Sequence, residues 1–263
     1  MTEDLSHYNS EGTKLRKAQL RMLEILVEVD AICTRHNIPY WIAYGSCLGA
    51  VRHGGFIPWD DDLDIALMKS DYKKMMPILQ KELPQHLVVQ DPKLTKRFHY
   101  NYGKVRDRNS RVKTNMWSIE ELGISIDIFP MQRTFFKKGK RFVDYFYRRS
   151  YKRVRRQTNS KLQYAIGLLS FPFAYLVKSV YCLLSAMLPK KYLVPVCGAP
   201  CDYYTKIEDT IPVKSIVFEQ YTFQGPANPD GYLKSIYGDY MKIPPKEKRL
   251  VHAIEDFIFY DSN

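Results

Sequence analysis

Residues 41–67 read WIAYGSCLGAVRHGGFIPWDDDLDIAL, and this stretch decides how the rest of the chain is interpreted. It holds four carboxylates within five positions: Asp60, Asp61, Asp62 and Asp64. Two like charges about 4 Å apart repel by roughly 4 kcal/mol at an effective dielectric constant near 20, so a folded protein exposes such a cluster or gives it a cation. The apolar flanks indicate a strand that enters a core. A bound cation is therefore favoured, and the chain is predicted to be a metal-dependent enzyme that acts on phosphates.

Alternation along this strand separates the acids from their apolar neighbours. Asp62 and Asp64 would point to one face, while Leu63 and Ile65 would point to the core. Two carboxylates on one face can hold Mg²⁺ and still leave coordination positions for a substrate phosphate. We expect Asp60 and Asp61 to support the metal ligands, with Asp60 reaching a metal as the alternative.

A third carboxylate is expected from a later strand, ISIDIF at 124–129, which places Asp127 among apolar residues. A lone buried acid costs several kcal/mol unless it is paired or binds a metal. A buried ion pair with an arginine is the alternative. With two acids already in place, the sequence predicts that Asp62, Asp64 and Asp127 are the catalytic residues and hold one or two Mg²⁺ ions, or Mn²⁺.

The phosphate-binding half of the site is expected at Gly45 and Ser46. A tight turn here, followed by a short helix to His53, would let the backbone approach an anion and direct free N–H groups at it. A glycine-serine pair alone is a weak signal, and it gains weight only from the acids that follow.

The order of elements outside this stretch predicts an α/β (α+β) fold, a small mixed sheet flanked by helices. A long amphipathic helix is expected over 14–37, a second helix over 70–83 and a last one over 246–259. The expected strands cover 40–44, 62–68, 86–90, 98–106, 111–114 and 124–129.

The middle of the chain differs in character. Residues 137–161 hold eleven Lys/Arg and one acid, so they carry 11 − 1 = +10 of the net charge of +12. The apolar run 162–188 follows, about 40 Å long as one helix. Pro172 is expected to divide it, and a central Lys178 costs about 2.5–3.5 kcal/mol in a bilayer. The pattern favours a helical hairpin lying on an anionic membrane surface over a buried helix pair beside a solvated basic face.

These features predict a catalytic core at 1–131, a basic and apolar helical insertion at 132–212, and a C-terminal segment at 213–263 that completes the catalytic domain. Five irregularly spaced cysteines and no recognisable signal peptide indicate a reducing compartment. Zinc at Cys197 and Cys201 is disfavoured, because no second ligand pair is evident. The expected location is cytoplasmic, peripheral at the inner face of the cell membrane.

The Gly-Ser pair, the acid-apolar-acid-apolar strand and the later apolar-acid-apolar strand together resemble the nucleotidyltransferase-fold pattern. Residues 41–67 resemble the signature of the LicD family, which includes bacterial phosphocholine transferases and is related to fukutin and fukutin-related protein. The resemblance touches residues 14–131 and 213–255. The features that carry it are Gly45-Ser46, Leu48-Gly49, Arg52, Gly55, the 57–62 stretch IPWDDD, Lys104, Arg106, the 126–130 stretch IDIFP, the 237–240 stretch YGDY, Pro244-Pro245 and His252.

The resemblance implies transfer of phosphocholine from CDP-choline to a sugar hydroxyl of a lipid-linked envelope glycan, a teichoic acid precursor or lipopolysaccharide, with release of CMP. Transfer of glycerol or ribitol phosphate from its CDP derivative is one alternative, and nucleotidyl transfer on the same fold is another. Nucleic-acid binding through the basic segment is an alternative of a different class. The apolar run beside that segment suits a membrane better, so no nucleic acid is expected.

The resemblance also implies roles for individual residues. Asp127 would help to deprotonate the acceptor hydroxyl, and Gly45 and Ser46 would contact phosphate. Arg52, Lys104 and Arg106 would offset diphosphate charge, with structural ion pairs as the alternative. His252 would contact substrate or be structural. Aromatic faces would hold the quaternary ammonium, and the candidates are Tyr44, Trp59, Tyr100, Tyr102 and Trp117.

Overall fold

The protein is described from a computed structural model, which covers residues 4–95, 98, 100–114, 121–134, 140–155, 160–189, 191–196, 203–249 and 254–260. A short 3₁₀ turn, η1 (Ser6–Tyr8), precedes the helix α1 (Lys14–Arg35). The side chain of Thr13 caps α1 by accepting a hydrogen bond from the Arg16 N–H. The helix predicted over 14–37 is confirmed and ends two residues earlier.

The central sheet is mixed, as predicted. Among the described residues it contains seven strands, five of them in the spatial order β1 (Trp41–Ile42), β2 (Asp64–Met68), β7 (Ser125–Thr134), β4 (Gly103–Asp107) and β3 (Leu87–Gln90). β8 (Tyr192–Pro195) also pairs with β7, and β9 (Thr205–Lys206) pairs with β8. β2 and β7 run parallel, whereas the other pairings are antiparallel. The α/β fold class is thereby confirmed.

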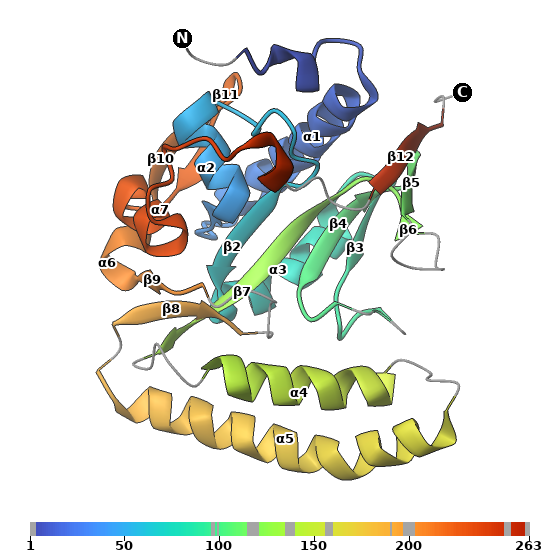
Figure 1. The fold of residues 1–263 in the computed structure, drawn as a ribbon, viewed down its shortest axis with the longest axis vertical. Coiled ribbons are helices and arrows are strands. Elements are labelled where there is room, and N and C mark those ends of the chain that lie inside the picture. The colour runs from blue at the N-terminus through green and yellow to red at the C-terminus, as the bar shows by residue number, and fades with distance from the viewer. Residues whose placement is uncertain are drawn as a thin grey trace.

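The helices flank this sheet (Figure 1). α1 and α3 (Lys69–Glu82) pack on each other, and both contact the central strand β7. α2 (Tyr44–His53) packs against β2 and against α7 (Pro229–Tyr237), which follows the small helix α6 (Ile207–Thr210) and the hairpin of β10 (Lys214–Phe218) and β11 (Tyr221–Gly225). The C-terminal part of the chain therefore lies beside the 41–67 stretch.

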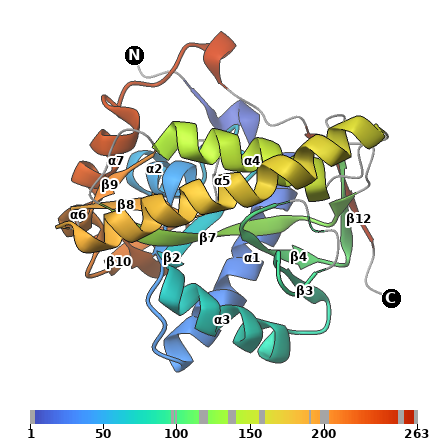
Figure 2. The same ribbon diagram turned by 90° about the horizontal axis from the view of Figure 1, so that it is seen from below.

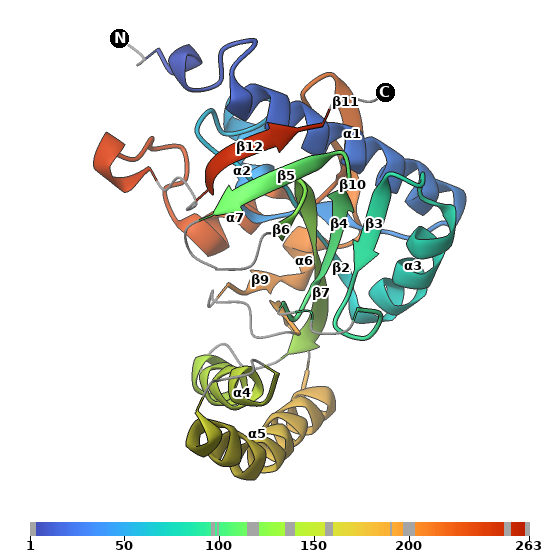
Figure 3. The same ribbon diagram turned by 90° about the vertical axis from the view of Figure 1, so that its right-hand side faces the viewer.

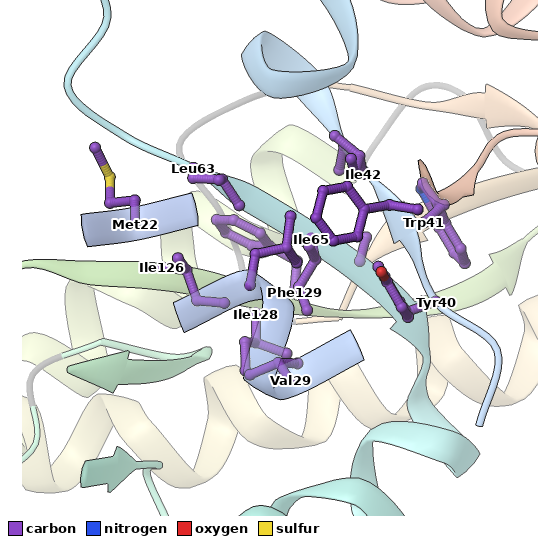
Figure 4. Packing of buried hydrophobic residues seen from close by; sticks show 14 of the residues in the cluster. Met22, Val29, Tyr40, Trp41, Ile42, Leu63, Ile65, Ile126, Ile128 and Phe129 are labelled. Carbon is purple, nitrogen blue, oxygen red and sulfur yellow. The ribbon is translucent and has the colours of Figure 1, made fainter. Parts of the chain in front are cut away.

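Packing in the core explains why the acids of β2 and β7 lie on the opposite face of the sheet. Leu63 and Ile65, together with Ile126 and Ile128 of β7, are fully buried and pack near side chains of α1 (Figure 4). Because side chains alternate along a strand, the intervening Asp64 and Asp127 point to the opposite face of the sheet. The predicted separation of Leu63 and Ile65 from the acids is confirmed.

The helix predicted over 246–259 is wrong. Lys246–Lys248 forms only a 3₁₀ turn, η2, and Ile254–Phe259 forms the strand β12, which pairs with β5 (Ser110–Thr114). β6 (Glu121–Leu122) lies on the other side of β5. The aromatic and β-branched residues at 257–259 suit a strand. Their partner lies more than 140 positions earlier in the chain, so local periodicity gave no sign of the pairing.

The basic and apolar segments form two helices, α4 (Lys140–Arg155) and α5 (Lys161–Met187), which lie side by side below the sheet (Figures 1 and 2). α5 runs through Pro172 without interruption, so the predicted division there is wrong. Proline removes one helical hydrogen bond and costs about 3 kcal/mol. Packing of α4 along α5 on both sides of Pro172, through Phe171 and Phe173, offsets that cost. The domain boundaries stay a prediction; β8 and β9, from within 132–212, extend the central sheet.

Candidate active site

The strand register brings three predicted site residues into one row. Asp64 of β2 pairs with Asp127 of β7 in the parallel ladder, and Asp127 pairs with Lys104 of β4 in the antiparallel ladder. Residues directly opposite one another in a sheet project to the same face. Two carboxylates therefore lie beside each other with a lysine next to the second.

Asp64 occupies the most crowded position of this row. Its side chain is only 8% exposed. Burial raises the pKa of the Asp64 carboxyl well above its usual range, and the neighbouring charges of Asp62, Asp127 and Asp60 raise it further, while Lys104 opposes them. The charges of Asp60, Asp62 and Asp127 therefore all act on this one buried carboxyl, so the structure brings the predicted acids into one region.

Lys104 of β4 pairs with Asp127, and Tyr102 lies nearby. The Lys104 ammonium lies 2.5 Å from Asp127 Oδ1, and both side chains are mostly buried. The Tyr102 hydroxyl lies near enough to the Asp127 carboxylate for its charge to act on it. Burial raises the pKa of the Tyr102 hydroxyl, and the Asp127 charge raises it further, so Tyr102 stays a donor. Lys104 was predicted to offset diphosphate charge, with a structural ion pair as the alternative, and Tyr102 to hold choline. Neither prediction identified Asp127 as the neighbour of these two side chains.

Two hydrogen bonds connect the start of α2 to the backbone of Asp64. Ser46 Oγ accepts a hydrogen bond of 2.8 Å from the Asp64 N–H, and the Ala43 N–H donates to the Asp64 carbonyl. A Cβ at Gly45 would meet Asp60 Oδ2 at 3.1 Å, so glycine lets the acidic loop approach the first turn of the helix. The predicted tight turn at Gly45 and Ser46 is wrong, because both residues lie within α2.

The other predicted cations lie apart from this row. Arg52 sits at the far end of α2, six residues or about 9 Å from Ser46. Its Nη1 donates to the Tyr240 carbonyl at 2.7 Å. Arg106 is buried and donates to Gln90 Oε1 and the Gly123 carbonyl. The geometry of both arginines favours the structural alternative. His252 and Trp117 lie outside the described residues.

Aromatic rings form a continuous series beside the carboxylates. Successive ring centroids in it are 4.5–5.8 Å apart, and the rings are those of Phe98, Tyr100, Tyr102, Phe129, Tyr44, Tyr203 and Tyr237. Lys104 Nζ lies 4.6 Å from the Tyr100 ring centroid and 5.5 Å from that of Tyr102, so a cation already occupies these faces. Trp59 instead faces the guanidinium of Arg249 at 4.8 Å.

Two tyrosines of α7 complete the surroundings of Asp64 and were missed as site residues. The Tyr232 hydroxyl accepts a hydrogen bond from the Tyr44 N–H. Burial raises the pKa of Tyr232 and of Tyr237, and the charge of Asp64 contributes to both shifts. The YGDY stretch at 237–240 was the only sequence signal for this part of the site, and it did not indicate which ring would approach the acids.

The donor set fits a divalent cation by charge and by chemistry. Asp60, Asp62, Asp64 and Asp127 supply carboxylate oxygens, the ligands that Mg²⁺ prefers. Among the described residues, no three His, Cys, Asp or Glu side chains are arranged closely enough to hold a metal ion as they stand. Lys104 lies against Asp127 and provides the one positive charge that acts on Asp64 in this set.

A clamp positions the loop before the acids. The Glu219 carboxylate, at the tip of the β10–β11 hairpin, accepts two bonds from the Arg16 guanidinium at 3.0 and 2.8 Å and one from the Phe56 N–H. Gln19 of α1 donates to the Asp60 carbonyl at 2.9 Å. α1 and the C-terminal hairpin thus hold residues 56–60 together.

Glu219→Gln is expected to lower the free energy of unfolding by about 2 kcal/mol at neutral pH, because hydrogen bonds to a charged group are lost. Burial would raise the pKa of Glu219, but the bonds from Arg16 and Phe56 outweigh it and hold the pKa below its usual range. The extra stability is therefore present above the unfolded-state pKa and is lost as the pH falls through the folded one.

Urea unfolding from neutral to acidic pH measures this difference, with Glu208→Gln as the control because that side chain is 77% exposed. A stability loss for Glu219→Gln that does not change with pH would contradict the charged clamp.

Comparisons with known proteins are consistent with the α/β fold described above. The model of the family described as LicD/FKTN/FKRP, nucleotidyltransferase domain, matches residues 37–176. The chain is 25% identical to the lipopolysaccharide cholinephosphotransferase LicD of Haemophilus influenzae over 261 residues, 92% of this chain and 97% of that protein. These matches extend into the basic and apolar middle, which the resemblance in the sequence did not cover.

Shorter matches connect the chain with two mammalian enzymes. It is 38% identical to the ribitol 5-phosphate transferase FKRP of Mus musculus over 69 residues, 26% of this chain and 14% of that protein. It is 29% identical to the ribitol-5-phosphate transferase FKTN of Homo sapiens over 63 residues, 24% of this chain and 13% of that protein.

Proposed function

Because the chain belongs to the LicD/FKTN/FKRP nucleotidyltransferase family, we propose that it is a Mg²⁺-dependent phosphotransferase. It moves phosphocholine from CDP-choline to a sugar hydroxyl of an envelope glycan, a teichoic acid precursor or lipopolysaccharide, and releases CMP. The observation that carries this proposal is the row of Asp64, Asp127 and Lys104 on one face of the sheet, with Asp60 and Asp62 close enough to act on Asp64.

Asp62, Asp64 and Asp127 are the residues that would hold the metal. When bound, Mg²⁺ would neutralise charge on the donor phosphates and so favour the departure of CMP. Asp127 would also take the proton of the acceptor hydroxyl, and its contact with Lys104, which orients the carboxylate, supports this role. Lys104 offers a positive charge to the donor phosphates on the same face. Arg106 positions β4 through its bonds to Gln90 and Gly123.

Two observations favour choline over ribitol as the transferred alcohol. The aromatic faces of Tyr100 and Tyr102 already contact a cation, the Lys104 ammonium, and such faces suit a quaternary ammonium. The cholinephosphotransferase also matches along nearly the whole chain, whereas the ribitol-phosphate transferases match about a quarter of it. Ribitol phosphate transfer is the second candidate, and those shorter matches support it.

Isothermal titration with CDP-choline, CDP-ribitol and CDP-glycerol, each with Mg²⁺ and with EDTA, tests the donor. We expect binding of CDP-choline that requires Mg²⁺. Tyr100→Leu should weaken CDP-choline about fivefold, corresponding to about 1 kcal/mol of cation–π attraction, and leave CDP-glycerol unchanged.

If the protein prefers CDP-ribitol, the proposed phosphotransfer stands, and the transferred group is ribitol phosphate instead of phosphocholine. Failure of the folded protein to bind any of the three donors would overturn the proposal.

A further inference from the structure

The exposed face of α5 is more apolar than its inner face. Large apolar side chains cover it, including Leu169, Phe173 and Leu176, which are 81%, 59% and 57% exposed. Among the described exposed side chains of α5, the polar ones are Lys161, Gln163 and Ser179. A helix on the surface of a protein in water has the reverse pattern. The exposed apolar side chains that continue this face are Leu162, Tyr164, Ile166, Leu168, Tyr175, Val180, Leu183, Leu184 and Met187.

α5 is fixed to the rest of the protein along its inner face. Tyr181 and Cys182 lie within 3.4–3.9 Å of Thr134 and Gln132 at the end of β7. Figure 3 shows the α4–α5 hairpin projecting from this end of the sheet, apart from the helices of the core. The apolar face is therefore presented by an ordered element of the fold.

α4 adds positive charge beside this apolar face. It contains seven Lys/Arg and one acid, so its net charge is 7 − 1 = +6. The two helices approach closely, because a Cβ on Gly167 of α5 would lie 2.7 Å from Arg153 Cβ. Lys178 Nζ lies 3.8 Å from the Tyr147 ring centroid, which turns this lysine of α5 toward α4 and away from the exposed face.

We infer that the α4–α5 hairpin docks the protein on an anionic lipid surface, with α5 lying in the plane of the membrane interface. Apolar burial of the exposed face and attraction between α4 and acidic headgroups act together in this mode of binding. α5 is long and apolar enough to cross a bilayer, with 11% of its apolar window buried in the protein. Spanning would carry the charges of α4 into hydrocarbon at about 2.5–3.5 kcal/mol each, which excludes it for a hairpin that stays intact.

This position also relates the membrane to the carboxylates. Asp127 lies seven residues before Thr134 on β7, roughly 20 Å from the hairpin end of that strand. If the proposed function holds, this distance suits an acceptor sugar that projects from a lipid anchor. Docking itself does not depend on the chemistry of the site, so the two can fail separately.

Co-sedimentation of the purified protein with vesicles tests the inference. The vesicles are phosphatidylcholine alone or mixed with phosphatidylglycerol, each across a salt series. We expect binding to the mixed vesicles that weakens as salt rises. The triple variant Leu169→Gln, Phe173→Gln, Leu176→Gln should reduce binding more than about tenfold, because three exposed apolar anchors are lost. Arg149→Gln with Arg153→Gln should reduce binding only to the anionic vesicles.

The matched control replaces exposed apolar residues elsewhere, Val217→Gln with Met241→Gln, and should bind like the wild type. CDP-choline titration of the triple variant should be unchanged, which separates lost docking from a damaged site.

Three outcomes would overturn the inference. Equal vesicle binding by the wild type and the triple variant is one. A dimer in analytical ultracentrifugation that the triple variant abolishes, without vesicle binding, would assign the face to a second copy. Retention on oligonucleotides without vesicle binding would assign the basic helix to nucleic acid.

Discussion

Asp64→Asn is expected to abolish phosphotransfer and at the same time to raise the stability of the metal-free protein. Burial and the charges of Asp62, Asp127 and Asp60 raise the pKa of the Asp64 carboxyl. The stability that a raised pKa confers is present below the unfolded-state pKa and is lost as the pH rises through the folded one. The neutral amide avoids this loss, so the metal-free variant should be more stable than the metal-free wild type at neutral pH.

Thermal unfolding with and without Mg²⁺ measures this prediction. The metal-free variant should melt about 2–4 °C higher per kcal/mol gained, and the difference should shrink toward acidic pH. Mg²⁺ should stabilise the wild type and leave the variant unchanged, because a ligand stabilises only a protein that binds it. Gain of stability with loss of activity is the usual sign of a functional carboxylate held in a crowded site.

The matched control is Asp91→Asn, a buried carboxylate that accepts bonds from the Tyr72 hydroxyl and the Lys93 N–H. It should lose stability. A similar loss of stability for Asp64→Asn would mean that hydrogen bonds stabilise the Asp64 carboxylate more than the neighbouring acids repel it. Near-normal turnover would rule out its catalytic role.

The acid cluster was predictable from sequence because its cause is local. Alternation along one strand separates Asp64 from Leu63, and an isolated acid in an apolar strand marks Asp127. That the two acids lie directly opposite each other was not predicted, and the parallel ladder of β2 and β7 shows it. The contact of Lys104 with Asp127 depends on which strand lies next to β7, and the sequence order of the strands does not reveal this.

Non-local packing also explains the errors in secondary structure. Residues 254–259 form a strand because β5 is available as a partner, although their spacing also matches an amphipathic helix. Pro172 sits within a continuous helix because α4 packs on both sides of it. Gly45 and Ser46 lie within α2, and the left-handed backbone that a tight turn requires falls at Tyr44 instead, whose φ is 46°.

Lys104→Met is expected to have the opposite effect on stability from Asp64→Asn. Removing one partner of a buried ion pair costs about 3–5 kcal/mol, because the other charge is left uncompensated. Lys104 also supplies the positive charge that opposes the acids around Asp64. The metal-free variant should therefore unfold more easily at neutral pH and recover at acidic pH, where the carboxylates are protonated.

Adding Mg²⁺ to the unfolding experiment tests whether Lys104 takes the place of a metal ion. If Lys104 serves as the cation of the cluster when no metal is bound, Mg²⁺ should stabilise Lys104→Met more than it stabilises the wild type. Lys104→Arg keeps the charge and should lose much less. Lys234→Met breaks the exposed ion pair with Asp230 and should cost at most about 1 kcal/mol, with no response to Mg²⁺. Loss of stability in Lys104→Met that Mg²⁺ does not restore would show that the pair with Asp127 is purely structural. Asp127 would then be removed from the metal ligands, and the search for a third ligand would turn to Asp60.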